Sequence, residues 1–300
     1  MASADFRPQS PVDGTRYFVP ETFTPLFYTP LYAELTPEQR RRYNQLHGCY
    51  CNEQIMFFEK LVAERVLSGL LRTRLDPPLR ARLYVFLEEE RRHTRMFHEL
   101  NRLCLPHWYE QKEFHFVITP SGLDAVLAWA SRHPWFFPLF VWLMMLQEER
   151  AVFFGHETLR RKEELEPHFV AVQRAHLADE IEHVQWDQDI LALIWSKATP
   201  RARHLSALLF RHVIGEFMMT PKRASLRVIS ALVGECPGLA PRLPRMRRAL
   251  LNLKNDREWN LSLYSRKIVP KTFALFDRSP EFCSLSRVLR GYQPNRKPHG

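Results

Sequence analysis

Apolar and polar positions repeat with helical spacing over most of this chain, and the strict alternation typical of strands is almost absent. The pattern predicts long helices over residues 36–71, 77–103, 134–161 and 167–197, and a short helix near 121–132. "TPEQ" (36–39) has the form of a capping box, with Thr36 as N-cap and Gln39 as its reciprocal partner. "RTRLDPP" (72–78) and "EELEPH" (163–168) are the expected turns. The chain is therefore predicted to be all-α.

The two ends of the chain differ from this middle part. Residues 1–35 contain repeated prolines and are expected to be extended, and residues 201–300 suggest three or four further amphipathic helices separated by prolines. The predicted organisation is an N-terminal extended segment (1–35), a four-helix bundle (36–200) and a C-terminal helical extension packed on the bundle (201–300).

Ionisable residues interrupt the apolar face of the fourth predicted helix in "HLADEIEHVQWD" (176–187). His176, Glu180 and His183 fall within about 60° of one another around a helix. Their stripe is continued by apolar residues on both sides, so burial of three ionisable groups would be costly without compensation. A bound cation supplies that compensation, because it favours carboxylates and neutral imidazoles in a water-poor site.

The second predicted helix has a smaller version of this pattern, Glu90-x-x-His93, on a stripe that is otherwise apolar. Helices joined by a short turn present facing residues at similar distances from that turn. This predicts Glu59 as the partner 31 residues before Glu90, and Glu149 as the partner 31 residues before Glu180. Glu53 remains an alternative to Glu59, and Glu148 an alternative to Glu149.

One glutamate from each of two helices, with Glu-x-x-His from each of the other two, is the ligand pattern of di-iron and di-manganese bundles. Mixed imidazole and carboxylate ligands suit iron or manganese and argue against a thiolate site. We therefore predict a ferritin-like four-helix bundle with a dinuclear metal centre. Asp179 and Glu89 each precede a ligand glutamate and could reach across to the imidazole of the facing motif, and Asp187 could serve similarly.

Charge is unevenly distributed along the chain. Residues 201–300 hold 20 Lys and Arg against 6 Asp and Glu, whereas the whole chain has a net charge of +10. No nucleic-acid-binding module is recognisable, so a solvated basic face or attraction of an acidic partner is favoured over nucleic acid. No apolar run is long enough to cross a membrane. The five cysteines form no disulfide or zinc pattern, and a cytoplasmic location is expected.

The motifs "EEERRH" (88–93) and "DEIEH" (179–183) resemble those of ferritin-like diiron oxygenases. With His176 included, "HLADEIEH" (176–183) resembles the His-x-x-x-Glu-x-x-His motif of the p-aminobenzoate N-oxygenase family. The resemblance implies two irons, O2 as co-substrate, and oxidation of an aryl amine to a hydroxylamine and on towards a nitro group. It also implies an external electron donor such as a ferredoxin or reductase. The seven implied ligands are Glu59, Glu90, His93, Glu149, His176, Glu180 and His183.

Two other functions stay open at this point. One is desaturation or hydroxylation of a carrier-bound acyl chain, in which His176 has no evident place. The other is a non-enzymatic iron-handling protein, although storage bundles are shorter than this chain. Manganese remains possible in place of iron, and a homodimer is one of the oligomeric states left open.

Overall fold

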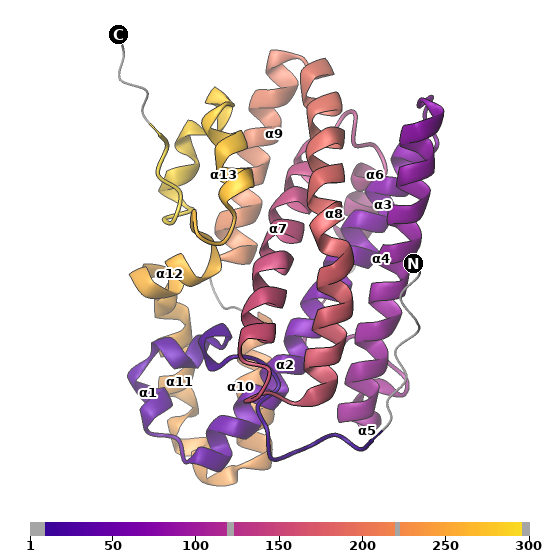
Figure 1. Cartoon of the computed structure of the whole chain (residues 1–300). Helices are drawn as coiled ribbons and strands as arrows, with labels where there is room; N and C mark the ends of the chain where they lie inside the picture. Colours follow the sequence, from indigo (N-terminus) through magenta and orange to yellow (C-terminus); the bar gives the residue numbers. More distant parts are fainter. Residues whose placement is uncertain (1–9, 119–122, 220–222, 296–300) are drawn as a thin grey trace.

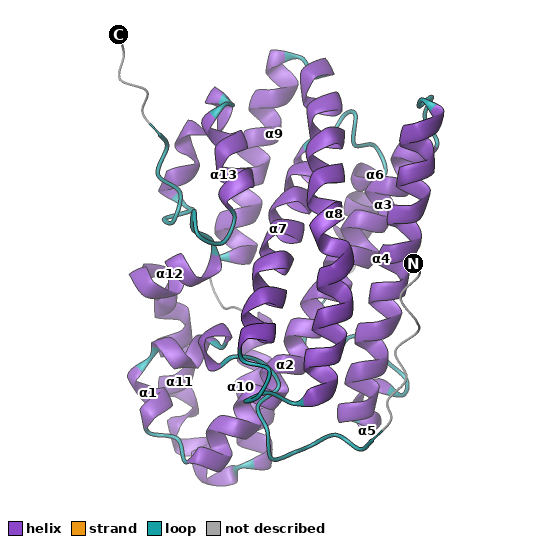
Figure 2. Ribbon diagram, viewed as in Figure 1, coloured by secondary structure: helices purple, strands orange, loops and turns teal. Residues whose placement is uncertain are grey.

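The structure is a computed structural model that describes residues 10–118, 123–219 and 223–295. These residues are predominantly helical and contain no strand, as Figure 2 shows. The all-α prediction is therefore confirmed.

Four long helical rods form the centre of the molecule (Figure 1). The first is continuous through α2 (Pro37–Phe58), the π-helical turn η3 (Glu59–Ala63) and α3 (Glu64–Leu71). The other three are α4 (Pro77–Cys104), α7 (Leu139–Arg160) and α8 (Pro167–Lys197). The first rod packs against α4, α4 packs against α8, and α8 packs against α7. The rods enclose the metal-ligand candidates described below.

Side-chain caps fix where these rods begin. Thr36 and Gln39 form the predicted capping box at the start of α2. Asp76 accepts the backbone N–H of Leu79 at the start of α4, and Glu166 accepts the backbone N–H of His168 and Phe169 at the start of α8. Each cap satisfies backbone donors that have no partner within the helix.

The C-terminal helices pack on the bundle. They are α9 (Pro200–Val213), the π-helical turn η4 (Ile214–Met218), α10 (Arg223–Glu235), α11 (Leu243–Asn252), α12 (Arg257–Leu263) and α13 (Pro270–Asp277), with 3-10 turns at Pro237–Arg242, Leu253–Asn255 and Pro280–Arg287. α10 lies against α2, and both α9 and α13 lie against α7. The sequence predicted fewer helices here, because short proline-bounded turns give weak periodic signals.

Three further details differ from the sequence prediction. Residues expected to be extended include 3-10 turns at Glu21–Phe23 and Pro25–Tyr28 and the short helix α1 (Pro30–Ala33). The third long helix begins at Leu139 rather than at 134, after a turn that ends at Pro138. The crossing segment between α4 and α7 contains α5 (Pro106–Tyr109) and α6 (Leu123–Ser131); the expected start of the latter near 121 falls outside the described residues. Within the described ranges, no helix is sufficiently long and apolar to span a bilayer.

Candidate metal centre

Six of the seven predicted ligands meet between the four rods. Glu90, His93, Glu180 and His183 have no exposed surface, and Glu59 and His176 are almost as fully buried. The side chains come from η3, α4 and α8, so residues far apart in sequence form one cluster.

The carboxylate of Glu180 lies at the middle of this cluster. Its Oε1 is 3.4 Å from Nδ1 of His93, 3.3 Å from Nδ1 of His183 and 2.9 Å from Nε2 of His176. All three histidines therefore present a ring nitrogen to a single carboxylate, and α8 itself supplies two of them.

Glu59 and Glu90 each approach histidines that also contact Glu180. Oε1 of Glu59 is 3.0 Å from Nε2 of His176 and 3.7 Å from Nδ1 of His93. Oε1 of Glu90 is 3.2 Å from Nδ1 of His183. Glu59 is also the first residue of η3, and π-helical turns inside α-helices occur frequently at functional sites.

The ligand atoms form two overlapping groups, each compact enough to hold one metal ion. Glu59, His93, His176 and Glu180 form the first group, and Glu90, His93, Glu180 and His183 form the second. Within each group, one ligand atom from every residue lies within 4.8 Å of the others. His93 and Glu180 belong to both groups, so the two groups adjoin each other.

The hydrogen-bonding state of these atoms fits a cation. Both carboxylate oxygens of Glu90 and of Glu180 are buried without a hydrogen bond, as are Nδ1 of His93 and Nδ1 of His183. Buried polar atoms are normally paired, so a group of unpaired acceptors facing one point needs a positive charge or protons between them. The donor set of carboxylates and imidazoles suits iron or manganese.

The outer nitrogens of two imidazoles are held by the residues that the sequence indicated. Nε2 of His93 lies 2.9 Å from Oδ2 of Asp179, and Nε2 of His183 lies 3.0 Å from Oε2 of Glu89. Each contact crosses between α4 and α8. With Nε2–H donated outward, Nδ1 carries a lone pair that points to the centre of the cluster, which is the tautomer a metal requires.

The structure places Glu148, not Glu149, at the cluster. Oε2 of Glu148 is 4.0 Å from Nδ1 of His183, whereas both carboxylate oxygens of Glu149 accept backbone N–H groups of α13, from Lys271 and Thr272, at 2.7 Å. The reason for the wrong placement is the turn length. Glu59 and Glu148 both lie 12 residues before the last residue of their rod, Leu71 and Arg160, but the second turn (161–166) is one residue longer than the first (72–76).

The structure also shows where the candidates Glu53 and Asp187 lie. The carboxylate of Glu53 is buried away from the cluster, where it accepts hydrogen bonds from Tyr109 Oη and from backbone N–H groups of 115–117. This placement favours Glu59 over Glu53. Asp187 is fully buried, and both its carboxylate oxygens lack hydrogen bonds, so it does not hold His183 as expected.

Three pKa shifts in the cluster reduce its uncompensated negative charge, whereas the nearby charge of His176 lowers the pKa of Glu180 and keeps that carboxylate ionised. Burial raises the pKa of Glu59 to about 8. Burial, followed by the charge of Glu180, raises the pKa of Glu148. Burial alone would lower the pKa of His176, but Glu180 and Glu59 raise it to about 10. Buried carboxylates this close together require balancing positive charge, which protons or a divalent cation can provide.

A pocket adjoins the cluster between α2, α7 and α8. It encloses about 630 Å³ including the space at its open mouth, and Glu59, Glu148 and His176 form part of its lining. Sequence reasoning missed the other polar residues that line it. Gln173 could have been found from the sequence, because it lies one turn before His176 on the same helical stripe. No comparable sequence pattern marks Gln54, Gln147 or Arg150.

The fold and the cluster thus define a helical bundle with a candidate dinuclear metal centre. Comparison with known families agrees with this class, because residues 4–232 match the family described as p-aminobenzoate N-oxygenase AurF. The chain belongs to this diiron-dependent oxygenase family. No curated protein and no solved structure matches the chain significantly.

Proposed function

We propose that the protein is a non-haem diiron oxygenase that uses O2 to oxidise the nitrogen of an aryl amine. The observation that carries this proposal is the pair of overlapping ligand groups that share His93 and Glu180, with a pocket against them. Membership of the N-oxygenase family supports the choice of reaction over other diiron oxidations.

The ligand assignment follows from the contacts. Glu59, His93 and His176 would hold one iron, and Glu148 and His183 the other. Glu90 belongs to the second ligand group, and Glu180, which belongs to both groups, would be available to either iron. When bound, the two irons supply the redox chemistry that activates O2, which no side chain in this cluster can provide.

The protein's own contribution is orientation and exclusion of water. Asp179 and Glu89 fix the tautomers of His93 and His183. Ile55, Phe58 and Phe154 give the pocket apolar walls, which limit competing access of water to the reacting nitrogen. Oxidation at the amine requires electrons from outside the chain, so an external one-electron donor is part of the proposal.

His176 distinguishes this site from a site with one histidine per metal. Its Nε2 lies within 3.0 Å of both Glu59 and Glu180, so it is placed as a ligand rather than as an ordinary core residue. Its ring also packs edge-on against His93 and Phe97, with centroids 4.6 Å and 4.9 Å away. These contacts favour an N-oxygenase over an acyl desaturase, which would not need the third imidazole.

Anaerobic loading with ferrous iron, followed by a metal count and an oxidation assay, tests the proposal. We expect about two irons per chain by the ligand geometry, and conversion of p-aminobenzoate to its hydroxylamine and nitro products when O2 and a reductant are supplied. An iron content near zero would contradict the oxygenase proposal. Two irons with oxidation of a carrier-bound acyl chain, but not of the amine, would instead support the desaturase alternative.

A further inference from the structure

The C-terminal segment contacts the α7 residues that line the pocket. Nε2 of Gln147 donates a hydrogen bond to Tyr264 Oη at 2.8 Å, and the guanidinium carbon of Arg150 lies 5.3 Å from the centroid of the Tyr264 ring. Gln147 and Arg150 both line the pocket beside the metal-ligand cluster. Tyr264 lies outside residues 4–232, so the match to the family does not cover it.

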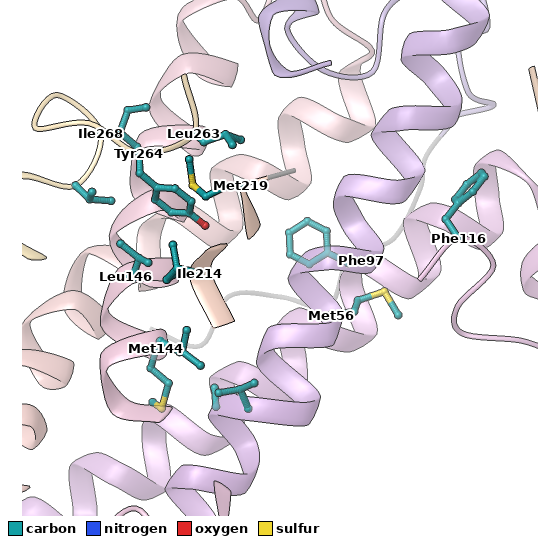
Figure 3. Close-up of a cluster of buried hydrophobic side chains, with 14 of the residues drawn as sticks. Met56, Phe97, Phe116, Met144, Leu146, Ile214, Met219, Leu263, Tyr264 and Ile268 are labelled. Carbon is teal, nitrogen blue, oxygen red and sulfur yellow. The ribbon is translucent and has the colours of Figure 1, made fainter. Parts of the chain in front are cut away.

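Tyr264 is rigidly held and can therefore fix its neighbours. Its side chain is 2% exposed and packs among apolar residues that include Leu146, Ile214 and Met219 (Figure 3). Its hydroxyl donates to Sδ of Met218 at 3.7 Å while it accepts from Gln147. A buried ring with both roles of its hydroxyl in use has little freedom to move.

The charge of Arg150 is not balanced locally. Among the described residues, no carboxylate lies within salt-bridge distance of its guanidinium. Its titratable neighbours on α2 are neutral, because burial lowers the pKa of His47 to about 3 and raises the pKa of Cys51 to about 12. Within the described part of the chain, the pocket therefore contains a cation that forms no ion pair with a carboxylate of the protein.

Arg150 follows Glu148 by two residues on α7, but the charge of its guanidinium acts on groups of α2 that lie N-terminal to Glu59. Cys51, on which the charge of Arg150 acts, precedes Glu59 by eight residues on the same rod. That spacing corresponds to two helical turns, or roughly 12 Å. Between the two levels, Ile55 and Phe58 on α2 and Phe154 on α7 give apolar walls. A flat apolar molecule with an anionic group at one end fits this distribution.

We propose that Tyr264 is a positioning residue that holds Gln147 and orients Arg150 to bind an anionic group of the substrate. The C-terminal segment thereby sets which end of the substrate faces the metal-ligand cluster. The orientation of the substrate nitrogen towards the cluster rests on the proposed function, whereas binding of an anionic group by Arg150 does not. The cation–π contact contributes orientation without consuming the hydrogen-bond donors of Arg150.

Equilibrium binding of benzoate and of its neutral analogue benzamide to the full-length, metal-loaded protein tests this proposal. We expect Arg150→Met to weaken benzoate binding at least tenfold and to change benzamide binding less than threefold. Tyr264→Phe keeps the ring but removes the partner of Gln147, and we expect it to weaken benzoate binding several-fold. Tyr292→Phe is the matched control, because it removes a buried hydroxyl of the same segment that bonds Asp277 instead of α7.

Equal losses of benzoate and benzamide binding in Arg150→Met would overturn the anion site. If Tyr264→Phe behaves like Tyr292→Phe while Arg150→Met is selective, Tyr264 has no positioning role. Circular dichroism of each variant confirms that the fold is retained. If Arg150→Met unfolds, Arg150→Gln replaces it, and if Tyr264→Phe unfolds, Gln147→Leu replaces it. If benzoate selectivity depends on Arg150 but no amine is oxidised, the proposed function fails and the anion site stands.

Discussion

The carboxylate of Glu149 accepts the backbone N–H of Thr272 at 2.7 Å and thus joins α7 to the first turn of α13. Its neighbour Glu148 faces the metal-ligand cluster instead. Adjacent residues on a helix differ by about 100° in direction, so only one of them can face the cluster. We predict that Glu148→Gln lowers iron content from about two per chain to about one, whereas Glu149→Gln retains both irons.

The same pair of variants separates binding from stability. Glu149→Gln replaces an anion that caps a helix N-terminus with a neutral amide, which should lower the free energy of unfolding by about 1–2 kcal/mol. Metal analysis after desalting, together with urea unfolding of both variants, measures the two effects. Loss of iron in Glu149→Gln with full retention in Glu148→Gln would reverse our assignment.

The sequence predicted the four rods and six of the clustered ligand candidates because both depend on periodic patterns. Glu90, His93, Glu180 and His183 lie on apolar stripes whose direction is set by helical geometry alone. The choice between Glu148 and Glu149 depended on the exact length of one turn, and periodicity carries no information about turn length.

The pocket could not be predicted for a related reason. Arg150 is one of many arginines in the sequence, and it contacts Tyr264, which lies more than a hundred residues away. Contacts between helices distant in sequence depend on how the C-terminal segment packs. Neither hydrophobic spacing nor local motifs specify that packing.

The contact between His93 and Asp179 predicts a selective effect on metal affinity. Asp179→Asn keeps the shape of the side chain but weakens the acceptor that fixes the tautomer of His93. We expect the affinity for ferrous iron to fall about 10- to 100-fold, with the fold unchanged. Competition with a metal-binding dye measures the affinity. Asp189→Asn serves as control, because Asp189 lies on α8 like Asp179 but pairs with the exposed Arg82 of α4 at 3.1 Å. An equal loss of affinity in this control would show a general charge effect.

Close packing at Gly69 predicts that any side chain at this position destabilises the fold. A Cβ at this position would lie 2.3 Å from the backbone oxygen of Arg132, so α3 and the end of α6 would have to separate. We expect Gly69→Ala to lower the free energy of unfolding by about 1–3 kcal/mol. Gly234 lies in α10 with no atom within 4 Å of an added Cβ, and Gly234→Ala should instead stabilise by about 0.5–1 kcal/mol. Urea unfolding of both variants tests the contrast, which two equal changes would contradict.

We predict that the buried carboxylate of Glu53 stabilises the fold through hydrogen bonds and is not a metal ligand. Its oxygens accept Tyr109 Oη at 2.7 Å and the backbone N–H groups of His115, Phe116 and Val117 at 2.6–3.0 Å. Gln at this position would turn an amide donor towards backbone donors, which should lower the free energy of unfolding by about 2–4 kcal/mol. Tyr109→Phe removes a single bond and should cost about 1–3 kcal/mol.

The iron content should stay at about two per chain in both variants, because Glu53 lies outside the metal-ligand cluster. Hydrogen exchange should accelerate at the amides of residues 115–117 in Glu53→Gln and less so in Tyr109→Phe. This local signature separates the lost hydrogen bonds from general destabilisation. Loss of iron in Glu53→Gln without faster exchange at these amides would show that Glu53, and not Glu59, is the ligand on this rod.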